Sequence, residues 1–160
     1  MEMVDPISAF TPVDADVRRR IVETLDRPLA VEAGAGTGKT TLLIARLLHA
    51  LEVGAVEMPG IVAISFTEKA AAELRLRLRQ ALEARVSARG DDAAVCARLQ
   101  AALRELHRAQ ISTIHAFASS ILRERPAESR LDPGFRVLDE LESLQLQRAF
   151  WRQWVDAELE

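Results

Sequence analysis

Apolar residues recur at every third or fourth position through much of the chain, which is the spacing of one face of an α-helix. This pattern predicts helices over residues 12–27, 40–52, 69–87, 93–106, 115–125 and 139–160. Thr11 and Pro12 are typical of the start of the first helix, because Thr caps helices and Pro suits their first position. The clearest stripe is Leu74, Leu78 and Leu82, with arginines largely outside it. The chain is therefore expected to be rich in amphipathic helices.

Three short segments have the character of strands instead. Ile61–Phe66 reads IVAISF, a compact β-rich run typical of a buried parallel strand. Leu29–Glu32 and Ala109–Thr113 are the other two predicted strands. Because the order along the chain is strand, loop, helix, strand and helix, the expected fold class is α/β, with a parallel sheet and flanking helices.

Composition narrows the setting of the protein more than its activity. The 160 residues carry a net charge of −3, so overall charge does not indicate a nucleic-acid partner. Cys96 is the only cysteine, which excludes an internal disulfide and suits a reducing cytoplasm. No apolar run approaches the roughly 20 residues of a membrane helix, and no secretory leader is evident. A cytoplasmic protein without a membrane partner is expected.

Lysine is rare in this chain, and its two positions are informative. Only Lys39 and Lys69 are lysines among 21 basic residues, the rest being arginines. Lysine carries a compact point charge on a flexible stem, whereas arginine presents a planar fork. Both positions are therefore candidates for sites that need the shape of an ammonium group.

Lys39 lies in a glycine-rich segment, AGAGTGKT, between a predicted strand and a predicted helix. It fits the phosphate-loop pattern G-x-x-x-x-G-K-[ST] except that Ala33 replaces the first glycine. Lys39 is expected to reach the β- and γ-phosphates of ATP, and the Thr40 hydroxyl to bind Mg²⁺. These two are the candidate catalytic residues. The expected nucleotide-binding residues are Ala33, Gly34, Ala35, Gly36, Thr37, Gly38, Lys39, Thr40 and Thr41.

Two further segments place polar groups after predicted strands. The carboxyl ends of parallel strands gather ligands, and an aromatic with hydroxyl and cationic groups suits single-stranded nucleic acid. Each residue also has a structural interpretation: core packing for the aromatic, a solvated helix start for the lysine, a helix cap for the second threonine and a satisfied structural role for the histidine. The candidate DNA contacts are Phe66, Thr67, Lys69, Thr113 and His115.

Taken together, the three segments resemble the superfamily 1 helicases of the UvrD/RecB type. AGAGTGKT is similar to their motif I, and ISTIHAF to their T-x-H-S-F motif. The long helical insert and LDPGFRVLDELES look most like the AddA and RecB branch, the recombination helicase–nucleases. The resemblance covers Asp14 to about Arg148. FTEKAAAELRLRL resembles motif Ia, with these residues in register: Ala70, Ala71, Glu73, Leu74 and Arg77.

The resemblance implies a P-loop NTPase with a RecA-like sheet. Residues 1–125 would form part of motor domain 1A, with a helical insert at about 80–108, and residues 126–160 the start of helical domain 1B. It further implies an ATP-dependent 3′–5′ helicase or translocase on single-stranded DNA, in recombinational double-strand-break repair, possibly with a second helicase–nuclease subunit.

Two residues depart from the family pattern. Glu68 stands where many members have Asn, a substitution associated with the RecB branch, and Asp16 stands where many have an adenine-reading Gln. Specificity for adenine through that contact is therefore in doubt.

One catalytic element of a phosphate-loop ATPase is not evident in the sequence. Such an enzyme needs a carboxylate pair at the end of a later strand. Asp139 and Glu140 are a poor candidate, because Arg136 interrupts the apolar run before them. The chain is therefore expected to be the N-terminal piece of a longer helicase, with little activity by itself. The alternative is a non-catalytic module that binds nucleotide or DNA and lacks the Walker B carboxylates and a second motor domain.

Overall fold

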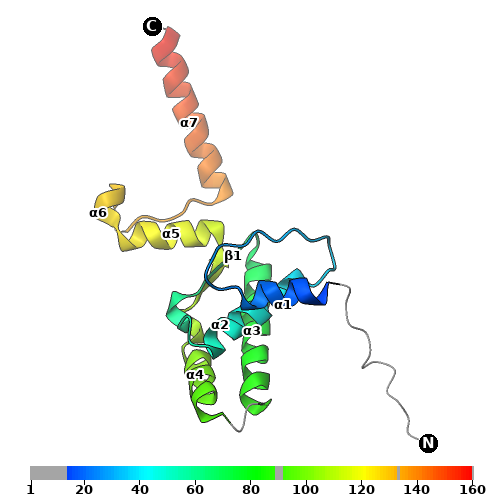
Figure 1. Ribbon diagram of the computed structural model, residues 1–160. Helices are drawn as coiled ribbons and strands as arrows, with labels where there is room; N and C mark the ends of the chain where they lie inside the picture. The colour runs from blue at the N-terminus through cyan, green and yellow to red at the C-terminus, as the bar shows by residue number, and fades with distance from the viewer. Residues whose placement is uncertain (1–13, 89–91, 133, 160) are drawn as a thin grey trace, which may run out of the picture. The chain divides into compact units, whose positions relative to one another are not determined.

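The computed structural model describes residues 14–88, 92–132 and 134–159 (Figure 1). Contacts divide the chain into two compact units, Met1–Ile114 and His115–Glu160. Within the described ranges, no helix combines the length and the apolar character that a membrane span requires.

The first unit is a mixed α/β structure, as the sequence predicts. Its sheet has two parallel strands, β1 and β2, paired from Val62↔Gln110 to Ser65↔Thr113. Short 3₁₀ turns precede each strand. The elements in order are α1 (Ala15–Glu23), α2 (Lys39–Glu52), η1 (Met58–Gly60), β1 (Val62–Ser65), α3 (Glu68–Ala88), α4 (Ala93–Arg104), η2 (Leu106–Arg108) and β2 (Gln110–Thr113).

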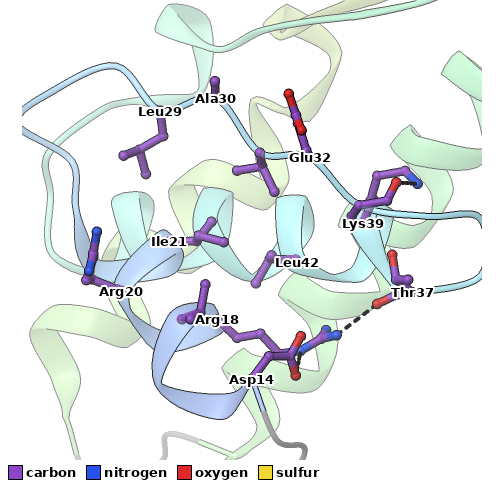
Figure 2. A pocket seen from close by; sticks show the side chains of 13 residues that line it. Asp14, Arg18, Arg20, Ile21, Leu29, Ala30, Glu32, Thr37, Lys39 and Leu42 are labelled. Atoms are coloured by element: carbon purple, nitrogen blue, oxygen red, sulfur yellow. Dashed lines mark hydrogen bonds and ion pairs between the residues drawn. The ribbon is translucent and has the colours of Figure 1, made fainter.

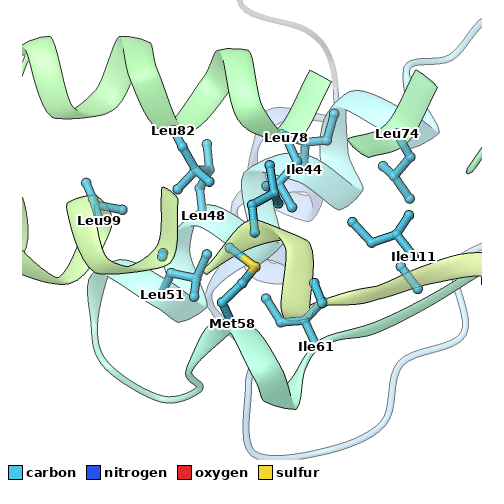
Figure 3. Packing of buried hydrophobic residues seen from close by; sticks show 14 of the residues in the cluster. Ile44, Leu48, Leu51, Met58, Ile61, Leu74, Leu78, Leu82, Leu99 and Ile111 are labelled. Atoms are coloured by element: carbon cyan, nitrogen blue, oxygen red, sulfur yellow. The ribbon is translucent and has the colours of Figure 1, made fainter. Parts of the chain in front are cut away.

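The core lies between α2, α3, α4 and one face of the sheet (Figure 3). The predicted leucine stripe of α3 is buried, and Leu78 and Leu82 are completely inaccessible to solvent. Successive strand side chains point to opposite faces of a sheet. Accordingly, Ala63 is buried against this core, whereas its neighbours Val62 and Ile64 are exposed.

The predicted strand Leu29–Glu32 is wrong. The segment is extended but unpaired, and Leu29 and Val31 remain exposed. A strand exists only where its N–H and C=O groups meet those of a neighbour, and the described sheet consists of β1 and β2 alone. The apolar run therefore leads into the glycine loop without joining a sheet.

The other predicted helices of this unit form close to their expected bounds. Asp92 caps α4, since its Oδ1 accepts the Val95 N–H at 3.1 Å. The predicted start of the first helix at Thr11 and Pro12 lies outside the described residues; the described part of α1 follows Asp14.

Charged groups tie the end of α2 to the helical insert. Glu52, the last residue of α2, is buried, and its carboxylate accepts a hydrogen bond from Arg85 Nε of α3 at 2.5 Å. Arg98 of α4 donates through Nε and Nη2 to the Glu52 carbonyl, at 2.9 and 2.6 Å. A charge-assisted network of this kind holds the phosphate-loop helix against both helices of the insert.

The second unit is helical. It contains α5 (Ile114–Glu124), α6 (Pro126–Ser129) and α7 (Glu140–Leu159). Asp139 caps α7, because its Oδ1 accepts the Glu142 N–H at 2.8 Å while Glu142 Oε2 accepts the Asp139 N–H at 3.1 Å. Arg136 grips the Glu142 carboxylate in a fork, and this hydrogen bonding lowers the pKa of Glu142. Asp139 thus begins a helix and does not end a strand.

Candidate nucleotide and DNA sites

The glycine loop leads directly into α2. Gly38 is the residue before the helix, and both Gly36 (φ 76°) and Gly38 (φ 86°) adopt the left-handed backbone region. Side chains with a Cβ are strained there, so these two positions require glycine. The first turn of a helix leaves its N–H groups unpaired and carries the positive end of the dipole. The loop therefore delivers the chain to a helix terminus suited to an anion.

Lys39 closes the loop on itself. Its Nζ donates to the carbonyl oxygens of Ala33 and Gly34, at 2.6 and 2.5 Å, while the Thr37 hydroxyl donates to the Gly34 carbonyl at 2.9 Å. The lysine side chain is exposed, so its charge stays accessible. The ammonium is thus held over the loop by two backbone acceptors.

The remaining predicted nucleotide-binding residues surround this lysine. Ala33, Gly34, Ala35 and Gly36 lie exposed along the loop, and Thr40 and Thr41 lie exposed in the first turn of α2. Backbone N–H groups, an ammonium and two hydroxyls at one helix terminus are the donor set that a polyphosphate needs. The Thr40 hydroxyl is likewise an oxygen ligand of the kind that Mg²⁺ accepts. The residues present therefore fit Mg²⁺–ATP.

Sequence reasoning missed Arg18. This residue of α1 donates from Nη2 to the Thr37 carbonyl at 3.0 Å and from Nε to Asp14 Oδ1 at 2.9 Å. The hydrogen bond from Arg18 lowers the pKa of the Asp14 carboxyl. Asp16, the residue at the usual adenine-reading position, forms an exposed ion pair with Arg19 instead. The only local signal for Arg18 is its position four residues after an acid, which also describes an ordinary helix pair.

A cavity of about 540 Å³ adjoins the loop (Figure 2). Ile21, Leu29 and Leu42 provide apolar wall, whereas Arg18 and Lys39 line it with charged groups. Asp16 is not among its lining residues. A largely apolar hollow with a few convergent polar groups is typical of a small-molecule site.

Four of the predicted DNA contacts lie at the carboxyl ends of β1 and β2. Phe66 follows β1 directly and is 95% exposed, so its alternative interpretation as core packing is wrong. Thr67 caps α3, with its Oγ1 accepting the Ala70 N–H at 3.1 Å. Lys69 is exposed in the first turn of that helix, and Thr113 ends β2 opposite Ser65.

Thr113 is not freely available, because it is 7% exposed and its hydroxyl donates to Glu68 Oε1 at 2.9 Å. Glu68 is the first residue of α3, and no pattern in the sequence indicates this contact with β2. The second threonine is thus bonded to a carboxylate from the neighbouring segment, which differs from its alternative interpretation as a helix cap.

His115 belongs to the second unit. It lies exposed in the first turn of α5, two residues after Thr113 in the sequence. Its contribution to the same DNA site stays a prediction.

Comparison with known proteins places the whole described region in one context. Residues 15–159 match the family model described as the UvrD/REP helicase N-terminal domain. Curated proteins similar to this chain are named as ATP-dependent helicase/nuclease subunits. The protein from Exiguobacterium sibiricum is 36% identical over 134 residues, 82% of this chain and 11% of that protein.

Two other relatives with this name give the same result. The Moorella thermoacetica protein is 41% identical over 123 residues, covering 74% of this chain and 8% of its own length. The Geobacillus thermodenitrificans protein is 37% identical over 118 residues, covering 72% of this chain and 9% of its own length. The chain thus spans about a tenth of the length of these curated relatives.

Proposed function

The chain belongs to the UvrD/REP helicase N-terminal domain family, and from this premise we propose that it is the ATP-binding part of an ATP-dependent DNA helicase or translocase. The observation that carries the proposal is the phosphate loop, with Lys39 held over it at the start of α2. A family match alone names a fold, whereas this loop supplies groups for phosphoryl chemistry.

We propose that Lys39 and Thr40 hold the nucleotide. Lys39 would bind the terminal phosphates, and Thr40 would ligate Mg²⁺, which neutralises charge that develops during phosphoryl transfer. Residues 33–38 would surround the phosphates with backbone N–H groups. Arg18 supports this role from outside the loop, because its bond to the Thr37 carbonyl fixes the backbone just before Lys39.

The proposed second ligand is single-stranded DNA at the carboxyl ends of β1 and β2. Phe66 offers an exposed ring for base stacking, and Lys69 an exposed cation for a phosphate. Thr67, Thr113 and His115 complete the proposed set. Such contacts hold the strand without reading its sequence.

The wider context is also a proposal. Residues 1–125 would be part of motor domain 1A and residues 126–160 the beginning of domain 1B. We propose 3′–5′ movement, a role in recombinational repair in the cytoplasm, and work beside a second helicase–nuclease subunit. The names of the relatives support membership of a helicase–nuclease complex.

Strand displacement tests the function as a whole. The native protein, as the cell makes it, should unwind a duplex with a 3′ single-stranded tail when supplied with ATP and Mg²⁺. A duplex with a 5′ tail should stay intact, since translocation toward the 5′ end from a 3′ tail leads into the duplex only in the first substrate. Unwinding from the 5′ tail alone would reverse the polarity, and DNA-independent ATP hydrolysis without unwinding would contradict the helicase proposal.

Phe66→Ala tests the DNA contact separately. The affinity for oligothymidine should fall by about 1–3 kcal/mol, because one base loses its stacking partner. The melting temperature should hardly change, since the ring is 95% exposed and contributes little to the core. Fluorescence anisotropy and thermal unfolding measure the two quantities, and Leu76→Ala on α3 serves as an exposed apolar control. Normal DNA affinity would remove Phe66 from the site.

A further inference from the structure

The proposed DNA edge contains a carboxylate where a phosphate would be expected. Glu68 is the first residue of α3, a helix of 21 residues, so it occupies the positive end of the helix dipole. The same carboxylate accepts the hydroxyl hydrogen of Thr113 at 2.9 Å. Two features that attract an anion to this edge, the helix terminus and the Thr113 hydroxyl, are therefore both used by an anion of the chain itself.

Lys69 does not cancel this charge by its position. Successive residues project about 100° apart around a helix, so neighbours do not face one another. Glu68 turns toward β2, as its bond to Thr113 requires, and Lys69 is exposed. The edge thus presents a cation and an anion in different directions, and an incoming strand meets both.

On the premise of the proposed DNA site, we propose that Glu68 competes with the DNA phosphate for Thr113 and the α3 terminus, and thereby sets the affinity of this edge for single-stranded DNA. A bound phosphate gains the hydroxyl of Thr113 only after Glu68 releases it. The carboxylate also repels phosphates nearby. A weakened grip of this kind suits a motor that must release each nucleotide as it advances.

Charge removal at this position gives the direct test. Glu68→Gln keeps an acceptor for Thr113 and removes the charge, whereas Glu68→Ala removes the acceptor as well. Both variants of the native protein should bind oligothymidine more tightly, by roughly tenfold for Ala, with the salt slope steeper by about 0.9 if one phosphate contact is gained. Fluorescence anisotropy at several salt concentrations measures affinity and slope together.

Glu83→Gln is the matched control. Glu83 lies on the same helix, is exposed, and its removal changes the net charge by the same amount. It lies 15 residues further along α3, roughly 22 Å at 1.5 Å per residue. An equal gain in affinity from Glu83→Gln would assign the effect to overall charge and overturn the proposal.

Lys69→Ala separates failure of this inference from failure of the DNA site. That variant should bind oligothymidine more weakly, with a slope shallower by about 0.9. Weaker binding by Lys69→Ala without tighter binding by the Glu68 variants would leave the DNA site standing and overturn the role of Glu68. Unchanged binding by Lys69→Ala and Phe66→Ala, with unchanged binding by the Glu68 variants, would overturn both.

Discussion

Lys39→Ala should lower the rate of ATP hydrolysis by the native protein roughly 10²–10³-fold, the usual cost of removing one preorganised charge-stabilising donor. The ammonium is held above the loop by the carbonyls of Ala33 and Gly34, so the donor is already positioned before nucleotide binds. The exposed side chain contributes little packing, and the melting temperature should therefore change little. Steady-state hydrolysis in the presence of single-stranded DNA, together with thermal unfolding, measures both effects.

Lys39→Arg is the informative control for this prediction. Arginine keeps the positive charge but replaces a compact ammonium with a planar fork. The two loop carbonyls accept at 2.6 and 2.5 Å from one nitrogen, a geometry that a guanidinium cannot copy without moving the loop. We expect arginine to restore little of the lost hydrolysis. Full rescue by arginine would show that charge alone matters, and normal hydrolysis by the alanine variant would remove Lys39 from the catalytic site.

Local signals explain what the sequence could predict. The glycine loop is a contiguous motif, so the pattern locates Gly36, Gly38 and Lys39 without knowledge of any distant residue. Helix α3 is equally local, because one face of it repeats leucine at every fourth position. The failed strand Leu29–Glu32 depends on a partner, and a partner is not a property of the segment itself.

The residues missed at the candidate sites share one property. Arg18 bonds to a carbonyl 19 positions away, and Glu68 to a hydroxyl 45 positions away. Neither contact leaves a periodic or motif-like trace in the sequence. Both residues resemble ordinary charges on a helix until the fold brings α1 to the glycine loop and the start of α3 to β2. Tertiary contacts of this kind decide which charges near a motif take part in its site.

Leu82→Ala should cost about 2–5 kcal/mol, the range for truncating a fully buried leucine. The Leu82 side chain is completely inaccessible and lies in the cluster that joins α2, α3, α4 and the sheet. Alanine would remove that packing and leave a cavity. Hydrogen exchange of the α3 and β2 amides in the native protein measures the free energy of opening for this unit, and it should fall by the same amount.

Leu76→Ala is the matched control, because it makes the same chemical change on the same helix at a side chain that is 55% exposed. Its effect should stay within about 0.5 kcal/mol. Leu82 lies 14 residues after Glu68, roughly 21 Å along α3, so DNA affinity of the folded protein should survive the substitution. Equal costs at both positions would contradict the packing of α3. Lost affinity with unchanged exchange would mean that the buried stripe positions the DNA edge more tightly than it stabilises the fold.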